Sequence, residues 1–469
     1  MNKLRWMNKR ITDLHKCAVE RALHSENGHL DLFLRFLLGL SLEDSQHVLT
    51  ELLPNLKIRA ESVSDTADYI KRKLNEEMSS DRSLNLFHCL SELKDNSLTT
   101  EIQKHLNSGN LSTQKLSPTH WSALVFVLLM SEKTQEKFEL KKYRPSEEGL
   151  TRLLPVVKNT RRALLASCNL GEKACESLKS ILTLENTSLK ELDISHNVLQ
   201  DSGVEILSAG LKSLHCQLKI LRLALCHFGG KSCENLGSVL QTETSSLKDL
   251  DISNNELHDS GVELLSAGLK SSHCKLEILR LALCHFGRKS CEILGSVLQT
   301  ETSSLKELDI SNNELHDSGV ELLSAGLKSS HCKLEILRLA LCHFGGKCCE
   351  NLGSVLQTET SSLKELDISD NELHDSGVEL LSAGLKSSHC KLEILRLLGC
   401  MVREEGCSSL ASALSSNPSY LKELDLSYNL LGEKGVILIS ARQEDPHCSL
   451  KTLRVEHDGE MRIRPKKCK

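Results

Sequence analysis

One 58-residue stretch decides the fold: LKELDISNNELHDSGVELLSAGLKSSHCKLEILRLALCHFGGKCCENLGSVLQTETSS, Leu305 to Ser362. Its opening string LKxLDI recurs in steps of 58 residues, at Leu189, Leu247, Leu305 and Leu363, with the variant LKELDL at Leu421. A second string, (L)(K/E)ILRL, recurs in the same steps at Leu218, Leu276, Leu334 and Leu392, with a weaker version at Leu450. The two series are offset by 29 residues, so the chain is built from 29-residue units of two alternating types.

Each unit begins with L-x-x-L-x-L-x-x-(N/C)-x-(L/F), the leucine-rich-repeat signature. The fourth and sixth positions point to one face of a short strand, and a helical stretch such as Gly261–Leu269 follows. One unit cannot bury both elements alone, so stacked neighbours share a core. We therefore predict an α/β fold, a horseshoe-shaped solenoid with a parallel sheet inside and helices outside. Eleven unit starts fit: 160, 189, 218, 247, 276, 305, 334, 363, 392, 421 and 450.

The ninth position of each unit alternates between asparagine and cysteine. Such side chains can satisfy backbone groups where the chain turns away from the strand. The predicted turn residues are Asn197, Cys226, Asn255, Cys284, Asn313, Cys342, Asn371, Cys400 and Asn429.

The fifth position lies between two buried leucines and must face out of the sheet, on the concave side. It holds Asp193, Arg222, Asp251, Arg280, Asp309, Arg338, Asp367, Arg396, Asp425 and Arg454. Neighbouring parallel strands place each aspartate beside two arginines. This row is either a self-neutralising ladder that supports the sheet or a recognition strip for a protein partner, and its lack of variation favours the ladder. Non-repeated chemistry at Gly399–Glu405 and Tyr428–Glu433 marks better candidates for selective contacts.

Before Tyr143 the 29-residue period is absent and helical patterning dominates. Helices are expected over Leu30–Leu40, Leu42–Leu53, Val63–Met78, Leu84–Leu93 and His120–Met130. We predict an all-α domain over 1–145 that can cap the first repeat, repeats over 146–455, and a tail over 456–469.

Composition argues against several classes of protein. The net charge of −5 and the aromatic content of 3% argue against a nucleic-acid binder. Met1–Lys16 is charged throughout, and no apolar run approaches a bilayer span, so neither a signal peptide nor a membrane anchor is expected. The 19 cysteines are then expected to be reduced thiols in a cytoplasmic protein.

Two local patterns resemble chemical sites but fail as such. His-Cys pairs recur every 58 residues, as at His273-Cys274, too far apart for four ligands to converge on one metal ion. Gly230-Lys231-Ser232 resembles the end of a phosphate loop, but Leu225 stands where the first glycine is required. We therefore expect no catalytic residue, no metal and no cofactor.

Several segments resemble a known family, the NLR innate immune receptors, and most closely its expanded group in bony fishes. GHLDLFLRFLLGLSLEDSQ (Gly28–Gln46), Leu84–Leu93, Ser117–Glu132 and Tyr143–Val157 resemble the helical segment after the NACHT ATPase. The repeats resemble the ribonuclease-inhibitor subtype, and LRVEHDGEMRIRP (Leu453–Pro465) resembles the lead-in to a PRY-SPRY domain.

The resemblance implies a cytosolic sensor whose repeats bind a protein partner or pathogen-derived ligand, or hold an ATPase inactive. A NACHT domain with its phosphate loop is absent from this sequence, so ATP binding is not expected of it. The sequence is expected to be a fragment, a truncated gene model or a shortened regulator that acts on full-length relatives. The alternative is a stand-alone protein inhibitor similar to ribonuclease inhibitor.

Overall fold

The computed structural model describes residues 11–42, 45, 60–76, 78–108, 111, 116–455 and 464–465. The chain forms two compact units, Met1–Ala163 and Leu164–Lys469. The domain limits given above remain predictions, and each unit is described by itself.

The first unit is a bundle of helices. They are α1 (Ile11–Leu23), α2 (Asp31–Gly39), α4 (Ala60–Lys73), α5 (Ser80–Glu92), α6 (Ser97–Ser108), α7 (Pro118–Leu129), α8 (Glu132–Glu136) and α9 (Glu147–Lys158), with short 3₁₀ turns at Glu26–Gly28 and Leu140–Lys142. Helix α7 lies at its centre, because Trp121, Leu124 and Leu128 are all buried. Ser117 caps this helix by accepting the backbone N–H of His120.

The N-terminal helical region was predicted correctly, but not all of its elements. Helices α2, α4, α5 and α7 overlap four of the five expected helices, whereas Leu42–Leu53 falls almost wholly outside the described residues. Helices α1, α6, α8 and α9 were missed, and α9 contains Pro155, which reads as a helix breaker in a sequence pattern. The all-α description is also incomplete, since a short strand, β1 (Lys137–Glu139), follows α8, and β2 (Arg162–Leu164) spans the boundary between the units.

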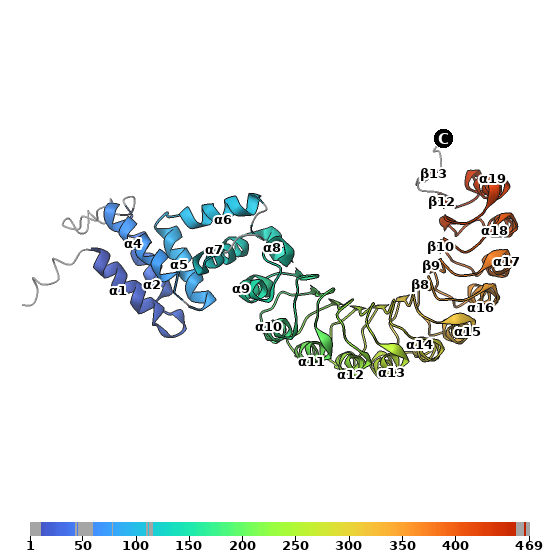
Figure 1. Ribbon diagram of the computed structural model, residues 1–469, viewed down its shortest axis with the longest axis horizontal. Helices are drawn as coiled ribbons and strands as arrows, with labels where there is room; N and C mark the ends of the chain where they lie inside the picture. The colour runs from blue at the N-terminus through green and yellow to red at the C-terminus, as the bar shows by residue number, and fades with distance from the viewer. Residues whose placement is uncertain are drawn as a thin grey trace, which may run out of the picture. The chain divides into compact units, whose positions relative to one another are not determined.

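The second unit is the predicted solenoid, with strands along its inner side and helices along its outer side (Figure 1). Its parallel strands are β3 (Glu191–Asp193), β4 (Ile220–Arg222), β5 (Asp249–Asp251), β6 (Ile278–Arg280), β7 (Glu307–Asp309), β8 (Ile336–Arg338), β9 (Glu365–Asp367), β10 (Ile394–Arg396), β11 (Glu423–Asp425) and β12 (Thr452–Arg454). The two-residue β13 (Arg464–Pro465) pairs antiparallel with β12.

One helix leads from each strand to the next. These helices are α10 (Glu172–Leu182), α11 (Gln200–Leu211), α12 (Gly230–Leu240), α13 (His258–Leu269), α14 (Arg288–Leu298), α15 (His316–Leu327), α16 (Cys349–Leu356), α17 (His374–Leu385), α18 (Glu404–Ser416) and α19 (Gly432–Glu444), and the 3₁₀ turn η4 (Gly346–Cys348) precedes α16. The α/β leucine-rich-repeat fold is therefore confirmed.

The register repeats from strand to strand, so that residues at the same position of each unit form rows. Leu221 of β4, for example, lies opposite Leu192 of β3 and Leu250 of β5. These leucines are fully buried, as are apolar helix residues such as Val262 and Leu265. The same register aligns one solvent-facing residue of each strand along the inner face.

Candidate partner-binding surface

The ten predicted concave residues form one row across β3–β12. Pairing aligns Asp193 with Arg222, Arg222 with Asp251, and so on to Asp425 with Arg454. All of them are half-buried except Asp425, which is 5% exposed. The row therefore exists as a continuous surface, and whether it binds a partner stays a prediction.

The arginines of this row are not paired mainly with the aspartates beside them. Arg280 Nη1 lies 2.8 Å from Asp249 Oδ1, and its Nη2 lies 3.0 Å from Glu307 Oε1. Both carboxylates stand at the third position of their units, two residues before the aspartate of the row. Arg222, Arg338 and Arg396 pair in the same way with Glu191, Asp249, Glu307, Glu365 and Glu423. The expected Asp–Arg ladder is thus corrected to a ladder between arginine and third-position carboxylates.

The aspartates of the row bond to their own turn instead. Asp251 Oδ1 accepts the backbone N–H of Ser253 at 3.0 Å, and its four counterparts make the same bond. An aspartate side chain is short enough to reach the N–H two residues on, whereas the long arginine side chain reaches a carboxylate diagonally across the strands. Arg454 pairs with both kinds of carboxylate, because its Nη2 lies 3.3 Å from Glu423 Oε1 and its Nη1 lies 3.5 Å from Asp425 Oδ2.

This inner face is acidic. Positions three and five of each repeat unit are the first and last residues of β3–β12. Together they hold ten carboxylates and five arginines, a net charge of −5. The carboxylates are Glu191, Asp193, Asp249, Asp251, Glu307, Asp309, Glu365, Asp367, Glu423 and Asp425. Burial raises the pKa of Asp249, while Arg280 and Arg222 act to lower it. The third-position residues were missed from the sequence, although a strand period of two places them on the same face as the fifth.

The turn asparagines join successive units. Asn313 Oδ1 accepts the backbone N–H of Cys284 at 2.9 Å, and its Nδ2 donates to the carbonyls of Leu281 and Ile310. Cys284 in turn donates its thiol to the carbonyl of Ile252 at 3.5 Å. These side chains are buried and therefore hold the backbone beneath the inner face rather than offering contacts to a ligand.

The cysteines are a structural set. Seventeen of the 18 in the described part of the chain are buried, and Cys17 is exposed. Burial raises the pKa of Cys226, Cys284, Cys342 and Cys400 to about 12, which suppresses the reactive thiolate.

The His-Cys pairs and the segment that resembles a phosphate loop both have structural roles. In His273-Cys274 the histidine is exposed and the cysteine is buried, so the two side chains do not share a site. The phosphate-loop-like segment at Gly230 opens α12, where the Ser232 hydroxyl donates to Asp201 Oδ1. Among the described residues, no group of three or more His, Cys, Asp or Glu side chains is placed to hold a metal ion.

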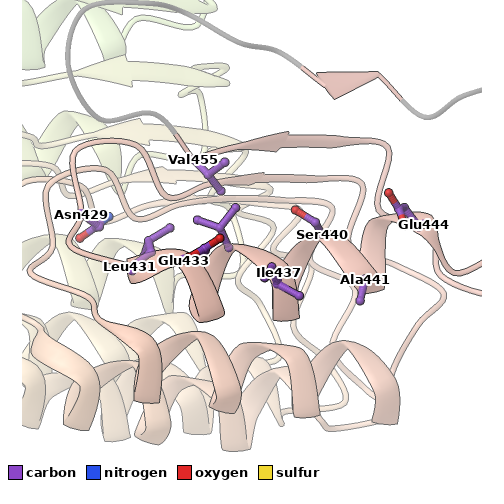
Figure 2. A pocket seen from close by; sticks show the side chains of 10 residues that line it. Asn429, Leu431, Glu433, Ile437, Ser440, Ala441, Glu444 and Val455 are labelled. Atoms are coloured by element: carbon purple, nitrogen blue, oxygen red, sulfur yellow. The ribbon is translucent and has the colours of Figure 1, made fainter.

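The C-terminal end of the described repeats carries a hollow along its last helix. A cavity of about 630 Å³ lies along α19 and is lined by Asn429, Leu431, Gly432, Glu433, Val436, Ile437, Ser440, Ala441, Glu444 and Val455 (Figure 2). Its lining comes from α19, from the turn before it and from Val455 directly after β12. Nearby, Tyr428 is 63% exposed, in the segment expected to make selective contacts.

Two family models match the chain. Residues 1–101 match the NLRC4 helical domain HD2. The leucine-rich-repeat model matches 185–208, 245–266, 303–324, 361–382 and 417–440. Neither is a family of enzymes, and no helix within the described residues is both long and apolar enough to cross a bilayer.

Curated relatives cover both parts. The chain is 32% identical over 457 residues to NACHT, LRR and PYD domains-containing protein 3 of Bos taurus, covering 94% of this chain and 43% of the relative. It is 39% identical over 306 residues to protein 12 of the same series from Mus musculus, covering 65% of this chain and 28% of the relative. It is 37% identical over 311 residues to ribonuclease inhibitor of Sus scrofa, covering 66% of this chain and 67% of that protein.

The chain thus spans less than half of the NACHT-containing relatives it matches. Among solved structures, an internalin of Listeria monocytogenes aligns at 16% identity and a TM-score of 0.36, over 77% of this chain and 95% of that one. The narrower resemblance to the fish group and the resemblance of the tail to PRY-SPRY stay predictions, and the tail lies outside the described residues except for 464–465. On its helical domain and its repeats, the chain belongs to the leucine-rich-repeat family that includes the NLR proteins and ribonuclease inhibitor, with repeats of the ribonuclease-inhibitor type.

Proposed function

We propose that this chain is the partner-binding part of a cytosolic NLR-type innate immune sensor, or a regulator of one, and that it has no catalytic activity. The observation that carries this proposal is the order of its parts. An HD2 domain precedes ribonuclease-inhibitor-type repeats, and the alignment to a NACHT-containing relative runs through 94% of the chain. The alignment to ribonuclease inhibitor covers 66% of the chain and leaves about a third of it unmatched.

The partner surface in this proposal is the inner face of β3–β12. Carboxylates outnumber arginines there by two to one, and each of the four central arginines already has two carboxylate partners. Aspartates such as Asp251 and Asp309 recur on every second strand, about 10 Å apart. Such a surface favours a protein partner with basic side chains, and charges of this kind govern mainly the association rate and specificity.

The test uses the whole chain, expressed in cells that contain an intact NLR relative, with inflammasome signalling as the readout. The chain should change signalling, and Asp251→Asn/Asp309→Asn/Asp367→Asn should weaken that change. The matched control is Glu205→Gln/Glu321→Gln/Glu379→Gln, which removes the same charge from exposed positions on α11, α15 and α17. No change in signalling at matched expression would contradict the proposal.

The second candidate function is a stand-alone inhibitor of a pancreatic-type ribonuclease, which the 37% identity to ribonuclease inhibitor favours. An acidic inner face suits this partner as well, so the surface alone does not separate the two functions. Inhibition of ribonuclease A at a one-to-one ratio would support the inhibitor, and full enzyme activity at a tenfold excess of the chain would exclude it.

A further inference from the structure

One edge of the repeats carries pairs of side chains that neither the fold nor the proposed function uses. The loop after each Asn-type strand presents the residue at position 12 of its unit, and the loop after the following Cys-type strand presents the residue at position 10. The two residues of a pair are 27 apart in sequence, and both are exposed in every pair. Four such pairs occur: Gln200 with His227, His258 with His285, His316 with His343, and His374 with Met401.

In the two central pairs both side chains are histidine, and their rings lie close together. The ring centroids are 6.0 Å apart for His258 and His285, and 6.2 Å apart for His316 and His343. The backbone sets these positions. All four histidines have φ between 53° and 58°, and the N–H groups of His258 and His316 donate to the carbonyls of Cys284 and Cys342.

The hydrogen bonds of the first ring in each pair leave one nitrogen available. His258 Nδ1 lies 3.3 Å from the carbonyl oxygen of His285, and His316 Nδ1 lies 3.2 Å from that of His343. A carbonyl oxygen can only accept, so Nδ1 carries the proton in this contact and Nε2 has the lone pair. A backbone carbonyl bound to the far ring nitrogen is the arrangement that orients metal-binding imidazoles.

We propose that His258 with His285, and His316 with His343, each bind one divalent transition-metal ion of the kind that prefers imidazole ligands, such as Zn²⁺ or Ni²⁺. Imidazole nitrogens bind such ions at about 2.0–2.1 Å, so two rings on one tetrahedral ion have centroids about 5 Å apart. The spacings of 6.0 and 6.2 Å are about 1 Å longer, so the exposed rings must turn toward each other to bind the ion. No third His, Cys, Asp or Glu of the described residues joins either pair. The other coordination positions therefore belong to water or to a side chain of a partner.

The two outer pairs serve as internal controls, because each contains only one histidine. Gln200 and His227 occupy the same positions as His258 and His285, with φ of 58° and 59°, but offer a single imidazole. The pair of His374 and Met401 likewise offers one imidazole. The proposal therefore predicts two sites per chain, one in each 58-residue copy that has both histidines.

The test is isothermal titration of the full chain with NiCl₂ at pH 7.5. Wild-type protein should bind two ions of similar affinity, and His285→Gln and His343→Gln should each remove one. His227→Gln is the matched control and should leave the stoichiometry unchanged. Gln200→His should add a third ion by completing the first pair. Because all these side chains are exposed, far-ultraviolet circular dichroism should be unchanged throughout.

Two results would overturn the proposal. The first is equal Ni²⁺ binding by wild type and by the His285→Gln/His343→Gln double variant, which would mean that scattered histidines bind the ion. The second is Gln200→His binding no more Ni²⁺ than wild type, which would mean that this edge geometry does not make a site.

Discussion

The backbone N–H of Cys226 donates to Asn255 Oδ1 at 2.9 Å, and this bond joins the turns of two successive repeats. The Nδ2 group of the same amide donates to the carbonyls of Leu223 and Ile252, each at 3.0 Å. One buried side chain thus satisfies backbone groups on two strands. Because the same contact recurs at Asn197, Asn313 and Asn371, it links successive repeats along most of the array.

We expect Asn255→Ala to destabilise the repeats by about 2–4 kcal/mol. The substitution removes the amide partner of the Cys226 N–H and of the Leu223 carbonyl, and each unsatisfied buried group costs about 1–3 kcal/mol. Urea unfolding followed by circular dichroism measures the loss. Glu256→Ala, at the exposed neighbouring position, should stay within about 0.5 kcal/mol of wild type. Equal midpoints for the two variants would contradict the linking role of the amide.

Gly268→Ala is expected to destabilise the array for a steric reason. A Cβ at Gly268 on α13 would meet the carbonyl oxygen of Gly237 at 2.4 Å and its Cα at 2.6 Å, both backbone atoms of α12. The two helices must move apart, and overpacking of this kind costs about 1–3 kcal/mol. Ser266→Ala, at a half-buried position of the same helix, provides the control in thermal unfolding. A melting temperature for Gly268→Ala equal to that of Ser266→Ala would show that the helices can separate freely.

Much of the repeat fold follows from spacing alone. The 29-residue period, the leucines at positions four and six and the helix after each turn are visible in the sequence, and the strands lie where that period places them, as at Leu192 and Leu221. The helices of the first unit were harder to predict because no repeated pattern reinforces them. Helix α9 was hidden by Pro155, and α1 by its many charged residues.

The side-chain partners on the inner face could not be predicted in the same way. The charge at position five alternates between negative and positive, which suggested ion pairs such as Asp251 with Arg280. The alternation shows only that these residues lie on neighbouring strands, not that their side chains pair. The choice of partner depends on side-chain length and on competing backbone groups. Arg280 therefore pairs with Asp249, and Asp251 accepts the backbone N–H of Ser253. The histidine pairs at the edge were also missed, because residues 27 apart meet there through the register of separate loops.

The helical unit should lose stability on mild acidification because of His15. This ring is fully buried, with Thr66 Oγ1 at 3.0 Å and Ser41 Oγ at 2.8 Å, and burial lowers its pKa from its usual 6.5 to about 4. The unfolded chain therefore takes up this proton first as the pH falls. The contribution of neutral His15 is complete above pH 6.5 and is lost on the way down to pH 4.

Between pH 7 and pH 5 this loss amounts to about 2 kcal/mol. The fluorescence of Trp121, buried in α7 of the same unit, reports the unfolding at both values. His15→Gln should be less stable than wild type at pH 7 and should lack this part of the pH dependence. His24→Gln, at a highly exposed histidine, should keep it. A wild-type midpoint that is the same at pH 7 and pH 5 would contradict the assignment to His15.

Cys348 marks one place where the duplicated blocks differ in local structure. Ser232 and Ser290 stand at this position in the two preceding copies and donate their hydroxyls to Asp201 and Asp259. Cys348 donates instead to the carbonyl of Gly345 at 3.2 Å, and the segment begins with the 3₁₀ turn η4 rather than directly as an α-helix.

Cys348→Ser should therefore stabilise the repeats, by about 1 kcal/mol, because the hydroxyl regains a charge-assisted bond to Asp317 at the start of the helix. Cys349→Ser is the contrasting variant: its side chain is fully buried, so a hydroxyl there should destabilise by about 1–3 kcal/mol. Urea midpoints of both variants measure the difference. If Cys348→Ser lowers the midpoint as Cys349→Ser does, the bond between serine and aspartate is not what stabilises this turn in the other copies.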